Sequence, residues 1–317
     1  ADLTDEQLEE AAEETISKLI PQLQNELLLS TSRYRYLTRK LKRTVLRAVR
    51  VLREHERRGA FRPLGLEISF GPQGDLPGME FKLADGSVIQ LRGRIDRVDG
   101  AGSEKGDYLR VIDYKSGNPS LSLPEIYYGL KLQLLTYLDV VLKHSSQLVR
   151  GGVRPGGVFY FKIHDPLVSA EGPEDPEEIE KKITRELKLK GYLLKDLEAV
   201  KLMHRDISGH SDLVPAAVSA DGEFYKNVET HLTGEKFSRL LIHVENLIGE
   251  TCREIMAGNV AIRPYRYKGK SPCAYCLYHS VCRFDASQPG QNYRNLPVKD
   301  SAGVWAEIGV GREGEHE

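Results

Sequence analysis

The sequence is poor in several features that define specialised protein classes. It holds 4 cysteines and 1 tryptophan in 317 residues, and its 45 Lys or Arg residues are balanced by 46 Asp or Glu residues. Four cysteines are too few for a disulfide scaffold. A formal net charge of -1 excludes a protein that coats DNA through overall positive charge. Any affinity for nucleic acid must therefore come from local patches or bound cations.

Long apolar runs are also lacking. No stretch approaches the roughly 20 apolar residues of a membrane helix, and the opening ADLTDEQLEE is acidic, unlike the basic and then apolar start of a secretory signal. The composition, 40% hydrophobic and 29% charged residues, is that of an ordinary globular protein rather than a disordered one. We expect a cytoplasmic protein in a reducing compartment.

The first 60 residues have helical periodicity. Thr4 and Gln7 form a capping-box pattern ahead of apolar residues at helical spacing, namely Leu8, Ala12, Ile16, Leu19, Leu23 and Leu27. A second helix is expected over residues 33–58, with one apolar stripe formed by Leu37, Leu41, Val45, Ala48 and Leu52. That segment has 11 Lys or Arg against 2 Glu. Its basic flank either follows a DNA backbone or is the solvated face of a packed helix.

The period then changes to that of strands. Alternating residues predict strands near residues 64–70 and 79–83, a turn at Asp85-Gly86, one run over 88–98 and another over 108–115. Ser122, Pro124 and Glu125 predict the start of a helix that continues to about Leu142. Residues 156–163 read as a buried strand. This order predicts a mixed α/β fold in which helices cover a central sheet.

The remaining segments divide the chain further. Helices are expected over residues 176–189 and 235–257, the second ending at Gly258, and weak strands within 204–227. We therefore expect a helical lead-in (1–60), a core (61–260), a cysteine-rich segment (261–295) and a loose tail (296–317).

Two neighbouring strands carry the candidate catalytic residues. Residues two apart on a strand point to the same face, so Asp113 and Lys115 project together from VIDYK. In the preceding strand, GRIDR, Asp96 faces opposite to Ile95, and Gly93 leaves room for a close approach to the backbone. If the two strands pair, Asp96 and Asp113 converge.

Two converging carboxylates repel each other unless a proton or a cation lies between them. A hard cation with oxygen ligands, Mg²⁺ or Mn²⁺, is the natural occupant. Lys115 would then hold or polarise the water that attacks a phosphorus atom. The plain alternative is that Asp96, Asp113 and Lys115 form a structural salt bridge at a strand end.

Five segments together carry a family resemblance: GRIDRVDG, LRVIDYKSG, EIYYGLKLQLLTYLDVV, GVFYFKIHDP and SPCAYCLYHSVCRFD. They resemble the RecB-like branch of the PD-(D/E)xK nucleases, and within it the AddB-type nuclease domains of bacterial helicase-nucleases. The likeness covers residues 3 to 295. It implies a restriction-endonuclease-like core with a central mixed sheet flanked by helices and followed by a cysteine-cluster segment.

The resemblance also implies roles for individual residues. Asp96 and Asp113 match the metal-binding carboxylates, and the backbone carbonyl of Tyr114 would be a further ligand. Lys115 matches the catalytic lysine. Gln133 and Tyr137, one helical turn apart, match a helix beside the active site, where they would contact DNA or support the lysine; the alternative for this pair is ordinary helix packing.

Two departures from the family pattern concern the active site. Family members carry an active-site histidine on an upstream helix, whereas the helices before Leu64 offer only His55, in a run (REHERRG) that does not match; the chain is expected to start downstream of that histidine. Glu67 lies on a strand near the site and could help to bind metal, although a solvent-facing carboxylate is the favoured interpretation.

The cysteines raise a similar question. Cys273, Cys276 and Cys282 have the spacing C-x2-C-x5-C and need a fourth ligand to complete a [4Fe-4S] cluster or a zinc site. Cys252 falls on the apolar stripe of its helix and reads as a buried residue. In the resembling family the fourth cysteine lies upstream of the core, which would make this cluster site incomplete; His279 is the alternative ligand, for Zn²⁺.

The function that the resemblance implies is a Mg²⁺-dependent deoxyribonuclease that resects DNA double-strand breaks for recombinational repair and cleaves the strand ending 5'. Gly269-Lys270-Ser271 lacks the earlier glycine of a phosphate-binding loop, so ATP hydrolysis would belong to an AddA-like helicase partner. The alternative is a DNA-binding or scaffolding module that has the nuclease fold but no catalytic activity and is held together by a structural zinc ion.

Overall fold

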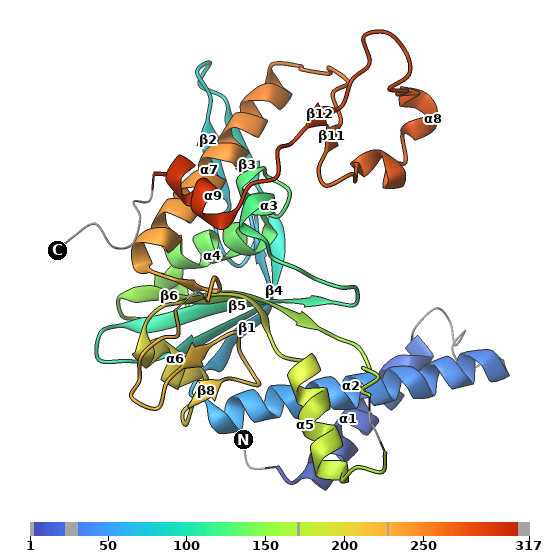
Figure 1. Cartoon of the computed structure of the whole chain (residues 1–317), viewed down its shortest axis with the longest axis vertical. Coiled ribbons are helices and arrows are strands. Elements are labelled where there is room, and N and C mark those ends of the chain that lie inside the picture. Colours follow the sequence, from blue (N-terminus) through green and yellow to red (C-terminus); the bar gives the residue numbers. More distant parts are fainter. Residues whose placement is uncertain (1–2, 23–30, 170–171, 227, 310–317) are drawn as a thin grey trace.

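A six-stranded mixed sheet forms the centre of the computed structural model, which describes residues 3–22, 31–169, 172–226 and 228–309. The strand order is β1 (Arg62–Phe70), β4 (Gly93–Ala101), β5 (Asp107–Lys115), β6 (Val153–Lys162), β7 (Lys190–Leu194) and β10 (His231–Leu232). Within this sheet, only the β5–β6 and β7–β10 pairs are parallel. Helices cover the sheet on both sides (Figure 1), so the predicted mixed α/β class is confirmed.

Two helices precede the sheet. The capping box at Thr4 and Gln7 is confirmed as the start of α1 (Asp5–Leu19), which is followed by the short 3-10 helix η1 (Ile20–Gln22). The predicted continuation through Leu23 and Leu27 lies outside the described residues. The basic helix is α2 (Ser32–Arg58), as predicted.

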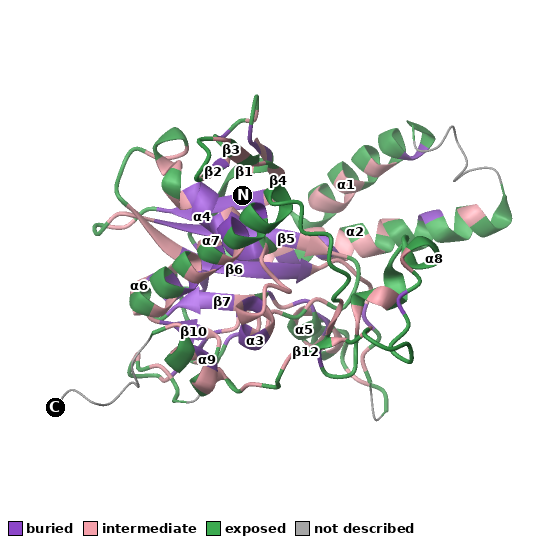
Figure 2. Cartoon of the chain, turned by 90° about the horizontal axis from the view of Figure 1, so that it is seen from above, coloured by how far each residue is buried: buried purple, intermediate pink, exposed green. Residues whose placement is uncertain are grey.

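The apolar stripe of α2 is buried over only part of its length. Ala48 and Val51 pack into the core, whereas Leu37, Leu41 and Val45 are 36–51% exposed. The first half of α2 therefore extends beyond the sheet alongside α1, and both are coloured mainly as exposed or half-buried in Figure 2.

The helix predicted to run from Ser122 to Leu142 is two helices, α3 (Leu123–Tyr127) and α4 (Gln133–Lys143), so that prediction is wrong in its length. Ser122 makes no side-chain capping bond. Gly129 has a φ of +77°, a left-handed conformation that glycine adopts readily and that ends a helix. The break lets α4 pack against β5 and β6 and begin at Gln133.

The single extended run predicted over residues 88–98 is also divided. β3 (Val88–Leu91) pairs with β2 (Met79–Lys82) in a separate hairpin across the Asp85-Gly86 turn, whereas β4 begins at Gly93 in the main sheet. Phe70 packs directly on Gly93, where an added Cβ would lie 2.6 Å from the ring. The absence of a side chain at Gly93 thus allows β1 to cover the start of β4.

The second half of the chain completes the layers. α5 (Pro176–Glu186) and α7 (Gly234–Met256) lie where helices are predicted, and Gly258 follows α7 with a φ of +69°. The short 3-10 helix η3 (Ser145–Gln147) precedes α5, and the short elements between α5 and α7 include α6 (Leu197–Met203), β8 (Gly209–His210) and β9 (Ala217–Val218). The sequence patterns did not predict β7 or α6.

The cysteine-rich segment contains β11 (Tyr265–Arg266), η4 (Pro272–Tyr275), α8 (His279–Cys282) and β12 (Arg294–Asn295). After it, the prediction of a loose tail is wrong for α9 (Ser301–Glu307), whose Val304 is fully buried. Residues 310–317 lie outside the described residues.

A buried ionic network anchors α2 to one face of the sheet. Both oxygens of Asp99, which is fully buried, are paired: Oδ1 with Nε of Arg97 at 2.6 Å, and Oδ2 with Nε and Nη2 of Arg110 at 2.9 and 2.8 Å. His55 of α2 is buried beside the two arginines, and burial together with their charges holds the pKa of its imidazole well below the usual value. Figure 1 shows α2 on the side of the sheet opposite to α4 and α7.

Candidate active site

Asp96 and Asp113 come together where β4 and β5 end their pairing. The antiparallel register runs to Arg97 opposite Ile112, the pair next to the two aspartates. At this point the backbone N–H of Tyr114 donates a 2.8 Å hydrogen bond to Oδ2 of Asp96. The Asp96 carboxylate is therefore fixed to the strand that carries Asp113, and its charge acts on Asp113.

Asp113 is buried, with a residue exposure of 1%. Burial is the main cause that raises the pKa of this carboxyl, and the nearby charge of Asp96 raises it further, while the ammonium of Lys115 opposes the shift. Oδ2 of Asp113 lies 2.6 Å from Nζ of Lys115 but makes no well-directed hydrogen bond to a described residue. This oxygen is thus held in the interior with an incomplete set of partners.

Lys115 connects the strand to helix α4. Its side chain is 36% exposed, and Nζ donates a 3.1 Å hydrogen bond to Oε1 of Gln133, the first residue of α4. Nε2 of Gln133 in turn donates to the hydroxyl of Tyr137 at 3.0 Å, and the Tyr137 ring meets Phe70 edge to face. The structure thus brings Lys115, Gln133 and Tyr137 into one chain of contacts, in which Gln133 itself is exposed rather than packed.

Tyr160 on β6 is a part of this site that the sequence analysis missed. It is paired in register with Asp113 across the parallel β5–β6 ladder, and its ring centroid lies 5.8 Å from Nζ of Lys115. Burial, followed by the charge of Asp113, raises the pKa of Tyr160 to about 12, so its hydroxyl keeps its proton. The alternation of Val158, Tyr160 and Lys162 along a strand beside β5 is the signal that would have found it.

Two residues considered for the site do not join it. Glu67 has an exposed side chain that pairs with Arg94 across 3.0 Å, which confirms the favoured solvent-facing interpretation. His55 lies in the buried network on the other face of the sheet, with neither ring nitrogen hydrogen-bonded to a described residue. Neither therefore adds a ligand to the carboxylate pair.

The two aspartates have the chemistry of a hard-cation site. Both offer oxygen ligands, and a cation would neutralise the repulsion that adds to the effect of burial on the pKa of Asp113 and would complete the partners of its Oδ2, which has only the ion pair with Lys115. Among the described residues no three His, Cys, Asp or Glu side chains gather as metal ligands. The residues present thus fit a divalent cation bound by two carboxylates, with water or substrate oxygens as its other ligands.

The three clustered cysteines lie in a different part of the molecule. Cys273 and Cys276 are on and next to η4, Cys282 ends α8, and all are free thiols with partial or full exposure. In the parts of the chain that the structure describes, they do not gather into a ligand group. Cys252 is buried on α7, and burial raises the pKa of its thiol, as expected for a packed rather than metal-bound residue.

No helix in the described ranges combines the length and apolarity that crossing a bilayer requires.

Comparison with known proteins identifies the family. The chain is 47% identical over 305 residues to an ATP-dependent helicase/deoxyribonuclease subunit of Pelotomaculum thermopropionicum and 43% identical over 300 residues to the equivalent subunit of Bacillus subtilis. These matches cover 96% and 94% of the chain, which spans only 26% of the length of each relative. A family model for the PD-(D/E)XK nuclease superfamily matches residues 1–283. The chain therefore belongs to the PD-(D/E)XK nuclease superfamily.

Proposed function

We propose that this chain is the deoxyribonuclease domain of a helicase-nuclease and hydrolyses phosphodiester bonds with the help of Mg²⁺ or Mn²⁺. The observation that carries the proposal is the pairing of a buried carboxylate with a lysine: Asp113 and Lys115 project from one strand end with their charged atoms 2.6 Å apart. The names of the relatives supply the substrate class and the helicase association.

The protein side chains have distinct tasks in this proposal. Asp96 and Asp113 would hold the cation, with the carbonyl of Tyr114 as a further ligand. A bound divalent cation supplies a water of lowered pKa and stabilises negative charge on the phosphate. Lys115 would hold that water or a phosphate oxygen through its ammonium, and Gln133 restricts the lysine to the required position. Tyr137 orients the amide of Gln133.

The test is cleavage of linear DNA by the purified chain with Mg²⁺. Asp113→Ala should abolish cleavage while leaving the far-ultraviolet circular dichroism spectrum unchanged. Asp107→Asn is a matched control because Asp107 begins the same strand, six positions from Asp113. Cleavage by the Asp113→Ala variant at the parent rate would refute the assignment.

The same assay separates this proposal from a binding module without turnover. Such a module would retain DNA in a filter-binding assay but would release no nucleotides in the presence of Mg²⁺ or Mn²⁺. DNA labelled at either the 5' or the 3' end tests the finer proposal that the chain cleaves the strand ending 5', as break resection with an AddA-like helicase subunit would require.

The cysteine segment carries a separate proposal about a cofactor. Cys273, Cys276 and Cys282 would hold a structural [4Fe-4S] cluster once a fourth ligand is supplied, and Zn²⁺ with His279 is the alternative. Anaerobic purification followed by iron, sulfide and zinc analysis decides between them. Brown protein with about four irons supports the cluster, and colourless protein with one zinc refutes it.

A further inference from the structure

The eleven basic residues of α2 fall into two groups. Six pair with carboxylates of the described chain: Arg43, Arg47, Arg50, Arg53, Arg57 and Arg58. The other five have no ion pair with a described residue and all lie within the first eleven residues of the helix: Arg33, Arg35, Arg39, Lys40 and Lys42. We name these five residues the basic tip.

The position of the acidic partners explains the division. Asp5 and Glu9, in the first half of the acidic helix α1, pair with Arg53 and Arg50. Where the second half of α1 lies beside the basic tip, the contact is neutral: Nζ of Lys42 donates to the hydroxyl of Ser17. The segment between the helices, residues 23–30, has one carboxylate in its sequence, that of Glu26. The basic tip therefore keeps a positive excess even if that carboxylate is counted.

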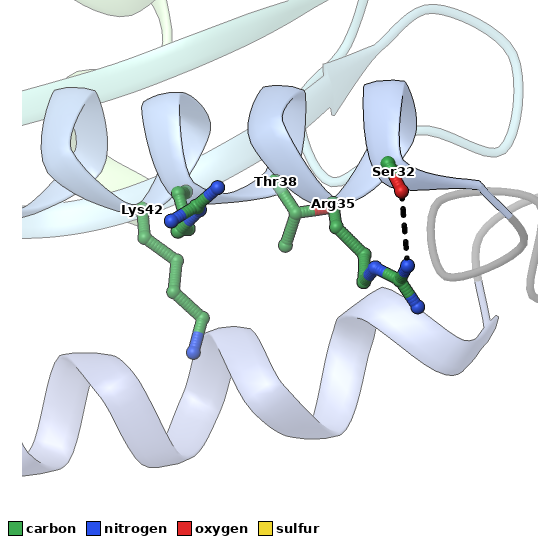
Figure 3. Close-up of a pocket in the computed structure, with 5 residues that line it drawn as sticks. Ser32, Arg35, Thr38 and Lys42 are labelled. Atoms are coloured by element: carbon green, nitrogen blue, oxygen red, sulfur yellow. Dashed lines mark hydrogen bonds between the residues drawn. The ribbon is translucent and has the colours of Figure 1, made fainter.

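The basic tip is open to solvent. Arg33, Arg35, Arg39 and Lys40 are exposed. A hollow of about 480 Å³ opens on the side of α2 that faces α1 (Figure 3). It is lined by Ser32, Arg35, Thr38, Arg39 and Lys42. None of these five residues is acidic, and the guanidinium of Arg35 hydrogen-bonds only to the hydroxyl of Ser32, at 3.1 Å, among the described residues. The hollow thus suits an anion.

The basic tip also lies at the active-site end of the sheet. Lys115 pairs in register with Lys162 at the ends of the parallel strands β5 and β6. Three residues later Asp165 makes ion pairs with Arg43 and Arg47 of α2. Lys42 is next to Arg43, and the helix then runs about 15 Å from Arg43 to Arg33 at 1.5 Å per residue. A row of positive charge therefore leads away from the strand ends that carry Lys115.

From this arrangement we infer that the basic tip binds the phosphate backbone of the DNA strand entering or leaving the active site. Cations without carboxylate partners lose no internal ion pair when they bind phosphates, and each releases a condensed counterion from the DNA. Tyr36, which is 59% exposed in the same stretch, offers a ring on which an unpaired base can stack. The inference depends on the proposed function for the identity of the polyanion.

The test compares two triple variants by fluorescence anisotropy with labelled single-stranded and duplex DNA, in EDTA so that no cleavage occurs. R33Q/R39Q/K40Q removes three exposed charges of the basic tip and keeps residues that favour helix. K195Q/K201Q/R205Q is the matched control because these three residues are exposed and make no ion pair in the described chain. Arg205 lies at the other end of α2, where its N–H bonds to the carbonyl of Arg58.

The basic-tip variant should bind DNA about 100-fold more weakly at about 0.1 M salt if all three residues contact phosphates. The slope of log K against log salt should fall by about 2 for single strands and by nearly 3 for duplex, whereas the control variant should match the parent. Unchanged affinity and slope would overturn the inference and assign this half of α2 to a protein partner that covers the exposed Leu37 and Leu41.

Hydrolysis of bis(p-nitrophenyl) phosphate with Mn²⁺ keeps this inference separate from the proposed function. The small ester does not reach the basic tip, so R33Q/R39Q/K40Q should hydrolyse it at the parent rate. Asp113→Ala should lose that hydrolysis in the same assay. Loss of DNA binding together with loss of small-ester hydrolysis in the basic-tip variant would contradict a separate binding surface.

Discussion

Gln133 accepts a hydrogen bond from Lys115 across 3.1 Å, and this contact joins the first residue of a helix to the last residue of a strand. The contact depends on the break between α3 and α4 at Gly129, because this break makes Gln133 the first residue of a new helix. The lysine is thus held by Gln133 of α4 as well as by its ion pair with Asp113.

Gln133→Ala should lower kcat for DNA cleavage by about 10- to 100-fold, the usual effect of removing a group that orients a catalytic residue. The affinity for DNA in EDTA should stay within about 2-fold of the parent. Tyr137→Phe should have a smaller effect because Gln133 keeps its contact with Lys115. A kcat that is unchanged in Gln133→Ala would show that Lys115 needs no support from α4.

Addition of Mg²⁺ should raise the melting temperature of the parent protein but not that of Asp113→Asn. A cation that binds only the folded state stabilises it by about 2.7 kcal/mol when its concentration is 100 times the Kd. In EDTA, without a cation, the charge of Asp113 has the opposite effect and lowers the stability of the fold. The pKa of Asp113 is raised above 3.8 in the folded protein, so its ionisation costs stability as the pH rises through that raised value. Differential scanning fluorimetry with and without Mg²⁺ at pH 8 measures both effects.

Asp99→Ala should destabilise the fold by about 3–5 kcal/mol, because it leaves Arg110 buried without its counter-charge and Arg97 with only Glu56, 3.9 Å away. Arg94→Gln is the matched control in the same strand: its ion pair with Glu67 is exposed, and such pairs contribute at most about 1 kcal/mol. Urea denaturation gives both values. Equal losses in the two variants would contradict the role of burial.

The free energy of unfolding should fall as the pH is lowered from 7.5 to 5, and His55→Phe should reduce that fall. Burial keeps the imidazole of His55 neutral in the folded protein, whereas in the unfolded chain its pKa returns to about 6.5 and it binds a proton below that pH. The pKa of His231 is lowered by burial to about 4, so His231 adds a loss of the same sign in both proteins. Urea titrations at the two pH values provide the measurement, and an identical pH dependence in the variant would contradict the assignment to His55.

Strand alternation was enough to predict that Asp113 and Lys115 share a face, because the period of 2 is a local property of the chain. The same local rule did not reveal that Asp99 and Arg110 pair on the opposite face, since that contact depends on which strands become neighbours. The capping pattern at Ser122 predicted a helix start but not its end, because the left-handed turn at Gly129 competes with helical periodicity.

Successive residues of β4 serve opposite sides of the sheet: Asp96 belongs to the carboxylate pair, and Arg97 and Asp99 belong to the anchoring network. A slip of one residue between β4 and its neighbours would exchange these sets, turning the guanidinium of Arg97 toward the proposed cation site and the carboxylate of Asp96 toward α2. Inserting or deleting a single residue within this strand should therefore inactivate and unfold the protein together.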